Sequence, residues 1–252
     1  MMRLGWLLTI GVVVVLVIVL ATLPAALLVQ RVELPVPVSQ VQGTIWSGEA
    51  RLRPPAQSPL QLSWQWRGGA EWHWQLTEAL AVTSGEAVGE AMGGVATRLN
   101  GRWSATSPQQ VTQVHGVVPL SRVDVLNALV VVRPTGHLEV AFEHVALPRG
   151  QPPRVRGQMI WAQAGLRGVV RESLGRVEML FSDDDAQRAQ LRSMEPAVIT
   201  VDGVIELTAT TYDIDVWLSA DRQSRLTRQL AQWGEVTDDG RVRIAMSGAL
   251  LW

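Results

Sequence analysis

The sequence contains no cysteine and no lysine, and it has only two phenylalanines and one tyrosine in 252 residues. Without cysteine there is no disulfide framework and no thiolate metal site, so stability has to come from the packed core. Without lysine, a phosphate-binding loop of the Walker A type is excluded, because that motif needs a lysine to reach the phosphates. Tryptophan, in contrast, occurs 11 times and is the main aromatic residue.

Net charge is also nearly absent, since the formal charge at pH 7 is -1. Binding to nucleic acid rests largely on a surplus of basic side chains, so we expect no nucleic-acid partner. Apolar residues make up 47% of the chain, which is ordinary for a folded protein. The length suffices for a membrane anchor followed by a domain of about 200 residues.

Motifs that carry catalytic chemistry are missing as well. The four histidines show no zinc-binding spacing, and no G-x-S-x-G nucleophile elbow is present. Ser47 is a conceivable nucleophile, but no pattern marks a base for it. The sequence therefore predicts a protein that is not an enzyme and that carries no metal and no cofactor.

A long apolar run lies near the amino terminus, where residues 4–29 contain no charged side chain. As a helix this run would measure about 39 Å, and a bilayer core is about 30 Å thick. Arg3 on the short flank places residues 1–3 in the cytoplasm. We expect a single-pass membrane anchor at 4–29, a linker at 30–40 and a β-rich domain at 41–252 on the non-cytoplasmic side of the membrane. A cleaved signal peptide is the alternative, although its apolar region would be shorter.

Strict alternation of apolar and polar residues predicts β-strands in the rest of the chain. Apolar residues take every second position in two consecutive runs: Leu60, Leu62, Trp64, Trp66, and then Ala70, Trp72, Trp74, Leu76. The same pattern recurs at 138–143, 154–161, 211–219 and 241–247. We therefore expect a mainly β fold, a curved antiparallel sheet with one apolar face.

The first two runs also predict a register. Directly opposed residues of a hairpin share a face, and a two-residue loop at 68–69 would place Trp66 opposite Glu71. A three-residue loop at 67–69 instead places Trp66 opposite Ala70 and Trp64 opposite Trp72. We predict this three-residue loop, with a glycine at positive φ.

The four tryptophans of these runs, Trp64, Trp66, Trp72 and Trp74, share one predicted face. Their alternation favours packing beneath a covering layer, with tryptophan pairs across the strands. The alternative is an exposed groove in which the indoles stack on a ligand or a partner.

Two short helices are expected to cover the apolar face. One begins near Ser121, with Leu126 and Val130 at helical spacing, and the other begins at Asp221 and ends before Gly234. Each is followed by a turn and a strand, which suggests two similar modules.

One short element connects the chain to a known family. Gly43-Thr44-Ile45-Trp46-Ser47-Gly48 resembles the G-T-L-W-S-G element of the type II secretion system protein N family, with Ile45 in place of leucine. Leu23-Pro24-Ala25 resembles the L-P-A end of that family's anchor. Its central segment is resembled by 119–121 and 134–138, and its C-terminal end by 238–241 and 247–250.

This resemblance implies an inner-membrane subunit of the bacterial secretion machine, with its domain 41–252 in the periplasm. The subunit would assist assembly or scaffolding of the machine, with other subunits as partners. Five residues of the element, Gly43, Thr44, Trp46, Ser47 and Gly48, are candidates either for a purely structural turn or for a docking site. A looser resemblance to AsmA-like proteins implies the alternative of a lipid-binding or lipid-transfer protein with an apolar groove.

Overall fold

The computed structural model describes the chain between Leu23 and Ala249 with gaps. The described residues are 23–25, 37–54, 58–78, 95–122, 133–146, 148, 154–167, 173–182, 187–194, 197–208, 210–220, 228, 230–232 and 234–249. The chain divides into two compact units, Met1–Glu86 and Ala87–Trp252. Fourteen strands and one 3-10 helix of three residues are described, so the mainly β prediction is confirmed.

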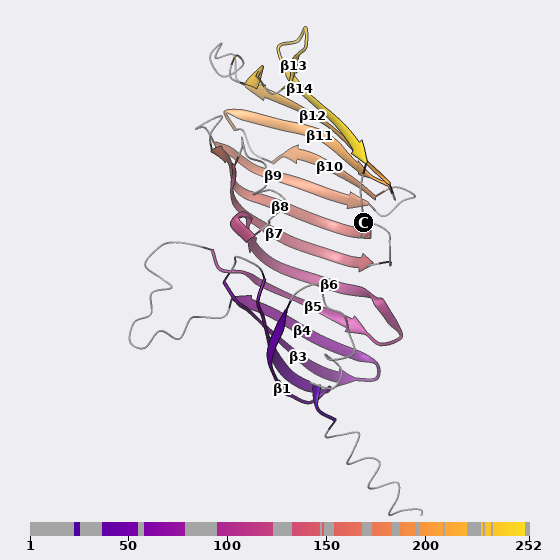
Figure 1. Cartoon of the computed structure of the whole chain (residues 1–252). Helices are drawn as coiled ribbons and strands as arrows, with labels where there is room; N and C mark the ends of the chain where they lie inside the picture. Colours follow the sequence, from indigo (N-terminus) through magenta and orange to yellow (C-terminus); the bar gives the residue numbers. More distant parts are fainter. Residues whose placement is uncertain are drawn as a thin grey trace, which may run out of the picture. The chain divides into compact units, whose positions relative to one another are not determined.

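Unit 1 is an antiparallel meander in which each strand pairs with the next along the chain (Figure 1). Its strands are β1 (Val38–Gly43), β2 (Ser47–Leu52), β3 (Leu60–Gly68) and β4 (Glu71–Glu78). Short connections favour this topology, because antiparallel neighbours need only a tight turn between them.

Unit 2 continues in the same manner, except that β14 lies between β12 and β13. Its elements are β5 (Arg98–Ser104), β6 (Ser107–Pro119), η1 (Leu120–Arg122), β7 (Arg133–Ala146), β8 (Arg154–Arg167), β9 (Ser173–Ser182), β10 (Gln187–Ser193), β11 (Ile199–Leu207), β12 (Thr211–Ala220), β13 (Glu235–Val236) and β14 (Val242–Ala249). All the strand pairs within unit 2 are antiparallel.

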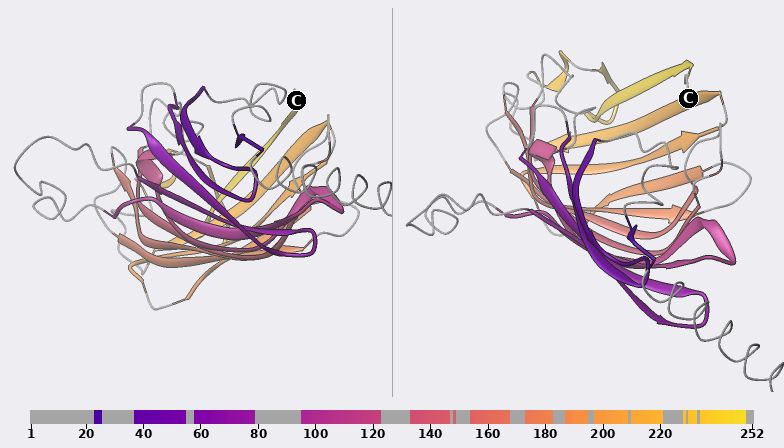
Figure 2. Two further views of the ribbon diagram at one scale, coloured as in Figure 1. Left: turned by 90° about the horizontal axis from the view of Figure 1, so that it is seen from below. Right: turned by 60° about the horizontal axis from the view of Figure 1, so that its bottom comes forward.

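The long strands of unit 2 bend along their length (Figure 2). The register shifts at irregular points between β5 and β6, between β7 and β8, and between β8 and β9. Gln113, with φ 52°, and Gln163, with φ 53°, lie at such points. Bulges of this kind add a residue to one strand and increase the local twist, which accounts for the bending.

The core of unit 2 lies on one face of its sheet. Among the strands described, β9, β11 and β14 supply its largest fully buried side chains, with Val177 and Ile199 at 0% exposure and Val242 at 1%. Leu230, which is helical and 1% exposed, packs into the same cluster. The period-two pattern therefore directs the apolar face toward this core.

The predicted helices are described only in part. Ser121 lies in η1, and the rest of that predicted helix, 123–132, falls outside the described residues. In the second, Arg228 and Leu230 are helical, while 221–227 lies outside. The division into two similar modules stays a prediction.

The predicted anchor at 4–29 lies outside the described residues, apart from 23–25. Within the part of the chain that the structure describes, no helix is both long and apolar enough to cross a membrane.

The predicted register of the β3–β4 hairpin is wrong by two residues. Trp66 pairs with Trp72 rather than with Ala70, and Trp64 pairs with Trp74. The turn consists of Gly69 and Ala70, and the extra residue is Arg67, which forms a bulge before Gly68 pairs with Glu71. The bulge adds one residue to the two-residue turn, so that opposed residues again share a face. This register differs from the predicted one by two residues, and alternation alone cannot distinguish the two.

Candidate functional site

The element that resembles the secretion family forms the turn between β1 and β2. Gly43 pairs with Gly48 at the base of this turn, which we call the 43–48 hairpin. The Thr44 N–H donates to the Ser47 carbonyl at 2.8 Å. The Thr44 hydroxyl oxygen in turn accepts from the N–H groups of Trp46, at 3.3 Å, and Ser47, at 3.2 Å. The threonine thus satisfies backbone groups that a tight turn leaves unpaired.

Gly43 and Gly48 are required in this hairpin because neighbouring atoms lie too close to leave room for a Cβ. Gly43 has φ +87°, and a Cβ there would lie 2.5 Å from the Ser47 carbonyl oxygen. A Cβ on Gly48 would lie 2.4 Å from the Gln42 carbonyl oxygen and 2.6 Å from the Trp64 ring. Real Cβ atoms do not approach so closely, so both positions exclude any side chain in this conformation.

Residues 23–25, which precede β1 in the chain, lie against the 43–48 hairpin. Pro24 forms an isolated antiparallel bridge with Thr44, and the Ile45 N–H donates to the Leu23 carbonyl at 3.1 Å. Ala25 is only 3% exposed. The two sequence elements that carry the family resemblance, about twenty residues apart in the chain, are therefore in direct contact.

Tryptophans of β3 and β4 hold the hairpin from the other side. The Trp64 indole N–H donates to the Thr44 carbonyl at 3.0 Å, and the Trp72 indole N–H donates to the Ile45 carbonyl at 3.0 Å. Trp46 stacks on Trp72 with ring centroids 6.2 Å apart and meets Trp66 edge to face at 5.1 Å. These contacts join aromatic packing to hydrogen bonding of otherwise unpaired turn carbonyls.

The two sets of residues singled out in the sequence therefore form one cluster. The 43–48 hairpin contacts Trp64, Trp66 and Trp72, and Trp74 lies directly opposite Trp64 on the same face. Trp66 is 41% exposed, while the other three tryptophans of β3 and β4 are half-buried. Ser47 is exposed at the β2 end of the turn, where it lies opposite Gln65 of β3. The arrangement is a rigid aromatic support that presents a small exposed turn.

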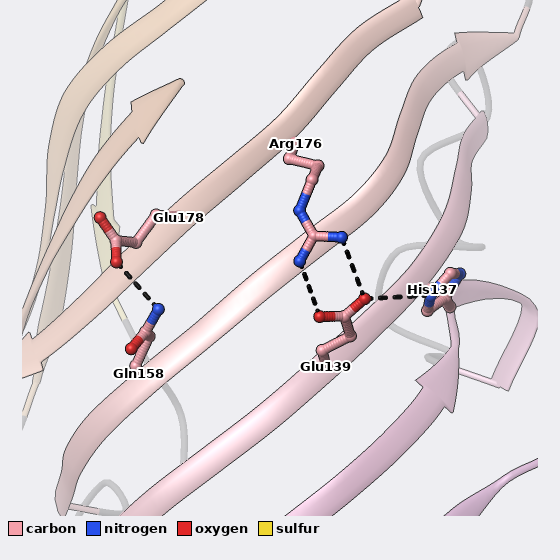
Figure 3. Close-up of polar contacts among 5 residues, drawn as sticks. All are labelled: His137, Glu139, Gln158, Arg176 and Glu178. Carbon is pink, nitrogen blue, oxygen red and sulfur yellow. Dashed lines mark hydrogen bonds and ion pairs between the residues drawn. The ribbon is translucent and has the colours of Figure 1, made fainter. Parts of the chain in front are cut away.

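A second group of polar contacts lies in unit 2, on the polar face of β7, β8 and β9 (Figure 3). Arg176 contacts both carboxylate oxygens of Glu139, at 2.9 and 3.4 Å, and Nε2 of His137 lies 3.6 Å from the same carboxylate. Gln158 donates to Glu178 at 2.9 Å. Glu139 and Glu178 both stand opposite Ile160, so the Arg176 pair bridges from β7 to β9 across β8.

Sequence reasoning missed this polar group. Glu139 lies on the predicted polar face of its strand, but Arg176 belongs to β9, which the alternation pattern did not identify. An ion pair between strands that are not neighbours appears only when the register of all three strands is known.

The turn between β13 and β14 contains the most strongly shifted acid among the described residues. The Thr237 hydroxyl donates to the Asp239 carboxylate at 2.5 Å, and the Arg241 guanidinium donates to it at 2.6 Å. These contacts, with that of Thr237 the larger, lower the pKa of Asp239 from 3.8 to about 2. Because the pKa is depressed in the folded state, the carboxylate favours folding above pH 3.8, and this contribution is lost as the pH falls through about 2.

Replacing Thr237 by valine should therefore raise the pKa of Asp239 toward its ordinary value. Thr237→Ser retains the hydroxyl and should leave the carboxyl titrating near its wild-type pH. NMR titration of the Asp239 side-chain carbon measures both variants. An Asp239 pKa unchanged by Thr237→Val would contradict the assigned cause.

Metal ligands do not gather in the part of the chain that the structure describes, since no three His, Asp or Glu side chains lie close enough to share an ion.

Comparison with known protein families gives a match that covers most of the chain. The family model for type II secretion system (T2SS), protein N, matches residues 35–245. That range covers most of the 252 residues and includes the 43–48 hairpin and its tryptophan support. No curated protein and no solved structure matches the chain.

Proposed function

Because the chain belongs to the type II secretion system protein N family, we propose that it is a non-enzymatic subunit that assists assembly or scaffolding of the secretion machine. In this proposal residues 4–29 anchor it in the bacterial inner membrane, and the β-rich part lies in the periplasm. Its partners are other subunits of the same machine. The family match over residues 35–245 carries the proposal.

The anchor proposal rests on the apolar run at 4–29 and on Arg3 before it. A reporter enzyme that is active only in the periplasm should be active when fused after Trp252. A reporter that is active only in the cytoplasm should be inactive at the same position. The purified protein should retain residues 4–29, and a mature amino terminus near Gln30 would refute the anchor.

The tip of the 43–48 hairpin is the docking surface in this proposal. Leu23 and Pro24, which belong to the proposed anchor 4–29, contact this hairpin, so in this proposal its tip lies close to the membrane, within reach of a membrane-bound neighbour. Rigid aromatic support suits a docking site, because a preorganised turn loses little entropy on binding.

Exposed Ser47 gives a test that separates docking from folding. Ser47→Arg should reduce secretion of a reporter substrate about tenfold or more, because an arginine at this end of the turn obstructs a close interface, while thermal stability stays near wild type. The assay uses a bacterium that lacks its own copy of the gene.

Gln75→Arg is the matched control, since Gln75 is an exposed residue of β4 outside the hairpin. It should leave secretion within about twofold of wild type, as substitutions on exposed surface usually do. Full secretion with Ser47→Arg would exclude docking at this tip.

Lipid binding, the role that the AsmA-like resemblance implies, is a second candidate that one observation favours. On the apolar face of unit 2, Phe142, Phe181 and Met179 share the side of the sheet that holds the core, yet they are only half-buried among the described residues. A half-covered apolar face of this kind suits an acyl chain.

Mass spectrometry of lipid that remains with the detergent-purified chain decides between these candidates. Phospholipid in about equal molar amount, lost in the variant Phe181→Asp, would favour lipid binding. If the purified chain carries no lipid although it supports secretion of the reporter substrate in the cell, lipid binding is excluded.

A further inference from the structure

The last long strand of unit 2 has one open edge. β14 pairs with β12 along its whole length without a register shift, from Val242 opposite Leu218 to Ala249 opposite Thr211. On its other side β13 pairs only with Val242 and Arg243. Residues 244–249 therefore have no strand beside them on that side among the described residues (Figure 1).

The backbone groups of alternate residues point out of this edge. In the turn before β14 the Thr237 N–H donates to the Arg241 carbonyl at 2.8 Å, so the groups of Arg241 face β13. In an antiparallel ladder the groups that face one neighbour recur at every second residue. The N–H and C=O groups of Ala245, Ser247 and Ala249 therefore face outward.

The pairing of β14 with β12, on the other side of β14, gives the same assignment. The Thr208 N–H donates to the Thr211 carbonyl at 2.9 Å, so residues 211, 213 and 215 of β12 direct their groups toward β11. Their partners on β14 are 249, 247 and 245. These three β14 residues consequently receive no ladder bond from β12, and their backbone groups point to the edge.

This edge lacks the features that normally prevent strand addition. Residues 244–249, Ile-Ala-Met-Ser-Gly-Ala, contain no charged residue and no proline, and the strand carries no bulge. The outer strand of unit 1 differs, because β1 has an irregular register between Ser39 and Gln42, with Gln40 at φ 53°. Met246 on β14 is 51% exposed. An unprotected edge of this length is suited to an added strand.

We propose that the open edge of β14 pairs with β14 of a second copy of the chain, antiparallel and centred on Ser247. In this register Ser247 stands opposite Ser247, and Ala245 stands opposite Ala249. All the outward groups of these residues are then paired, and pairing ends where β13 already occupies Arg243.

Side-chain complementarity favours the second copy as the occupant. Met246 of one copy comes opposite Gly248 of the other, where the Tyr212 ring covers the glycine, since a Cβ there would lie 2.6 Å from the Tyr212 hydroxyl. Methionine sulfur packs well at the edge of an aromatic ring. Opposed serines form a hydrogen-bonded pair, and no like charges meet, because the segment has none.

Cysteine pairs test the register in the full chain, in membranes. Because the chain has no cysteine, each introduced thiol is the only one in its copy. Ser247→Cys alone should form a disulfide-linked dimer, since opposed residues of a hydrogen-bonded pair lie about 5.5 Å apart, within disulfide range. Differently tagged Ala245→Cys and Ala249→Cys copies, expressed together, should also crosslink.

The same positions supply their own controls. Ala245→Cys or Ala249→Cys expressed alone should crosslink at least about tenfold less, because the identical residues then stand roughly 14 Å apart along the strands. Met246→Cys alone should likewise fail. Crosslinking of Met246→Cys in preference to Ser247→Cys, or no crosslink in the mixed pair, overturns the proposal.

A backbone variant tests the edge without thiols. Ser247→Pro removes the outward N–H, and a proline is tolerated on an edge strand whose N–H faces solvent. When a tagged copy is purified from cells that also make an untagged copy, the amount of untagged chain recovered with it measures self-association. This amount should fall about tenfold with Ser247→Pro and stay within about twofold with Ser247→Ala, which keeps the N–H. Resistance to protease should match wild type in both.

Unchanged recovery with a protease-resistant Ser247→Pro variant overturns the proposal. If Ser247→Cys instead links to a different protein, the edge takes a heterologous strand, and the second copy is excluded as its occupant.

Discussion

Replacing Trp72 by alanine is expected to lower the free energy of unfolding by about 3 kcal/mol, a large share of the stability of a typical domain. Trp72 stacks on Trp46 with an interplanar angle of 13°, and its indole N–H satisfies the Ile45 carbonyl. The substitution removes the stacking and the buried ring area, and it leaves that carbonyl unpaired. Urea unfolding of the detergent-solubilised full chain, followed by pulse proteolysis, measures the change.

Trp66→Ala is the matched control, because it removes the same kind of side chain from the position on β3 that lies directly opposite Trp72. Trp66 is 41% exposed, and its indole N–H bonds to Gly69 within its own turn. Its loss should cost about 1 kcal/mol, since it buries less area and orphans no group of the 43–48 hairpin. A cost for Trp66→Ala equal to that of Trp72→Ala would contradict the proposed support of the hairpin.

The second large effect is expected at Leu230 in unit 2. Leu230→Ala should cost about 3–4 kcal/mol, because the side chain is 1% exposed and leaves a cavity among Ile199, Val177 and Val242. The same unfolding assay applies. Gln232→Ala serves as the control, since Gln232 is exposed two residues further on and its truncation should change stability by less than about 0.5 kcal/mol.

The outcome at Leu230 bears on the prediction that a C-terminal helix covers the sheet. A cost below about 1 kcal/mol would mean that the residue does not fill a packed site, and the covering role would be excluded. With the larger cost, secretion should fall through loss of folded protein, unlike the loss expected for Ser47→Arg, in which the fold survives.

Several features could be predicted from local pattern alone. Strands were recognised where apolar residues alternate without interruption, as in β3, β4, β7, β8, β12 and β14. Others were missed where the pattern is broken. Leu180 is 45% exposed on the polar face of β9, and Gly203 interrupts the apolar face of β11 because a Cβ there would lie 2.5 Å from the Asp215 carbonyl oxygen.

The sequence by itself determined the mainly β class, the face on which Trp64, Trp66, Trp72 and Trp74 lie, and the family, through the six residues from Gly43 to Gly48. These follow from local properties: period two assigns each side chain to a face, and a tight turn with close backbone contacts demands particular residues.

Only the tertiary structure decided which residues of those faces meet. The Arg67 bulge moved the β3–β4 register, Leu23 came to lie against Ile45, and Arg176 reached Glu139 across an intervening strand. Sliding a strand by two residues preserves every face, so alternation cannot choose among such registers. The choice depends on side-chain fit and hydrogen bonds between segments distant in the chain, which exist only once the strands have paired.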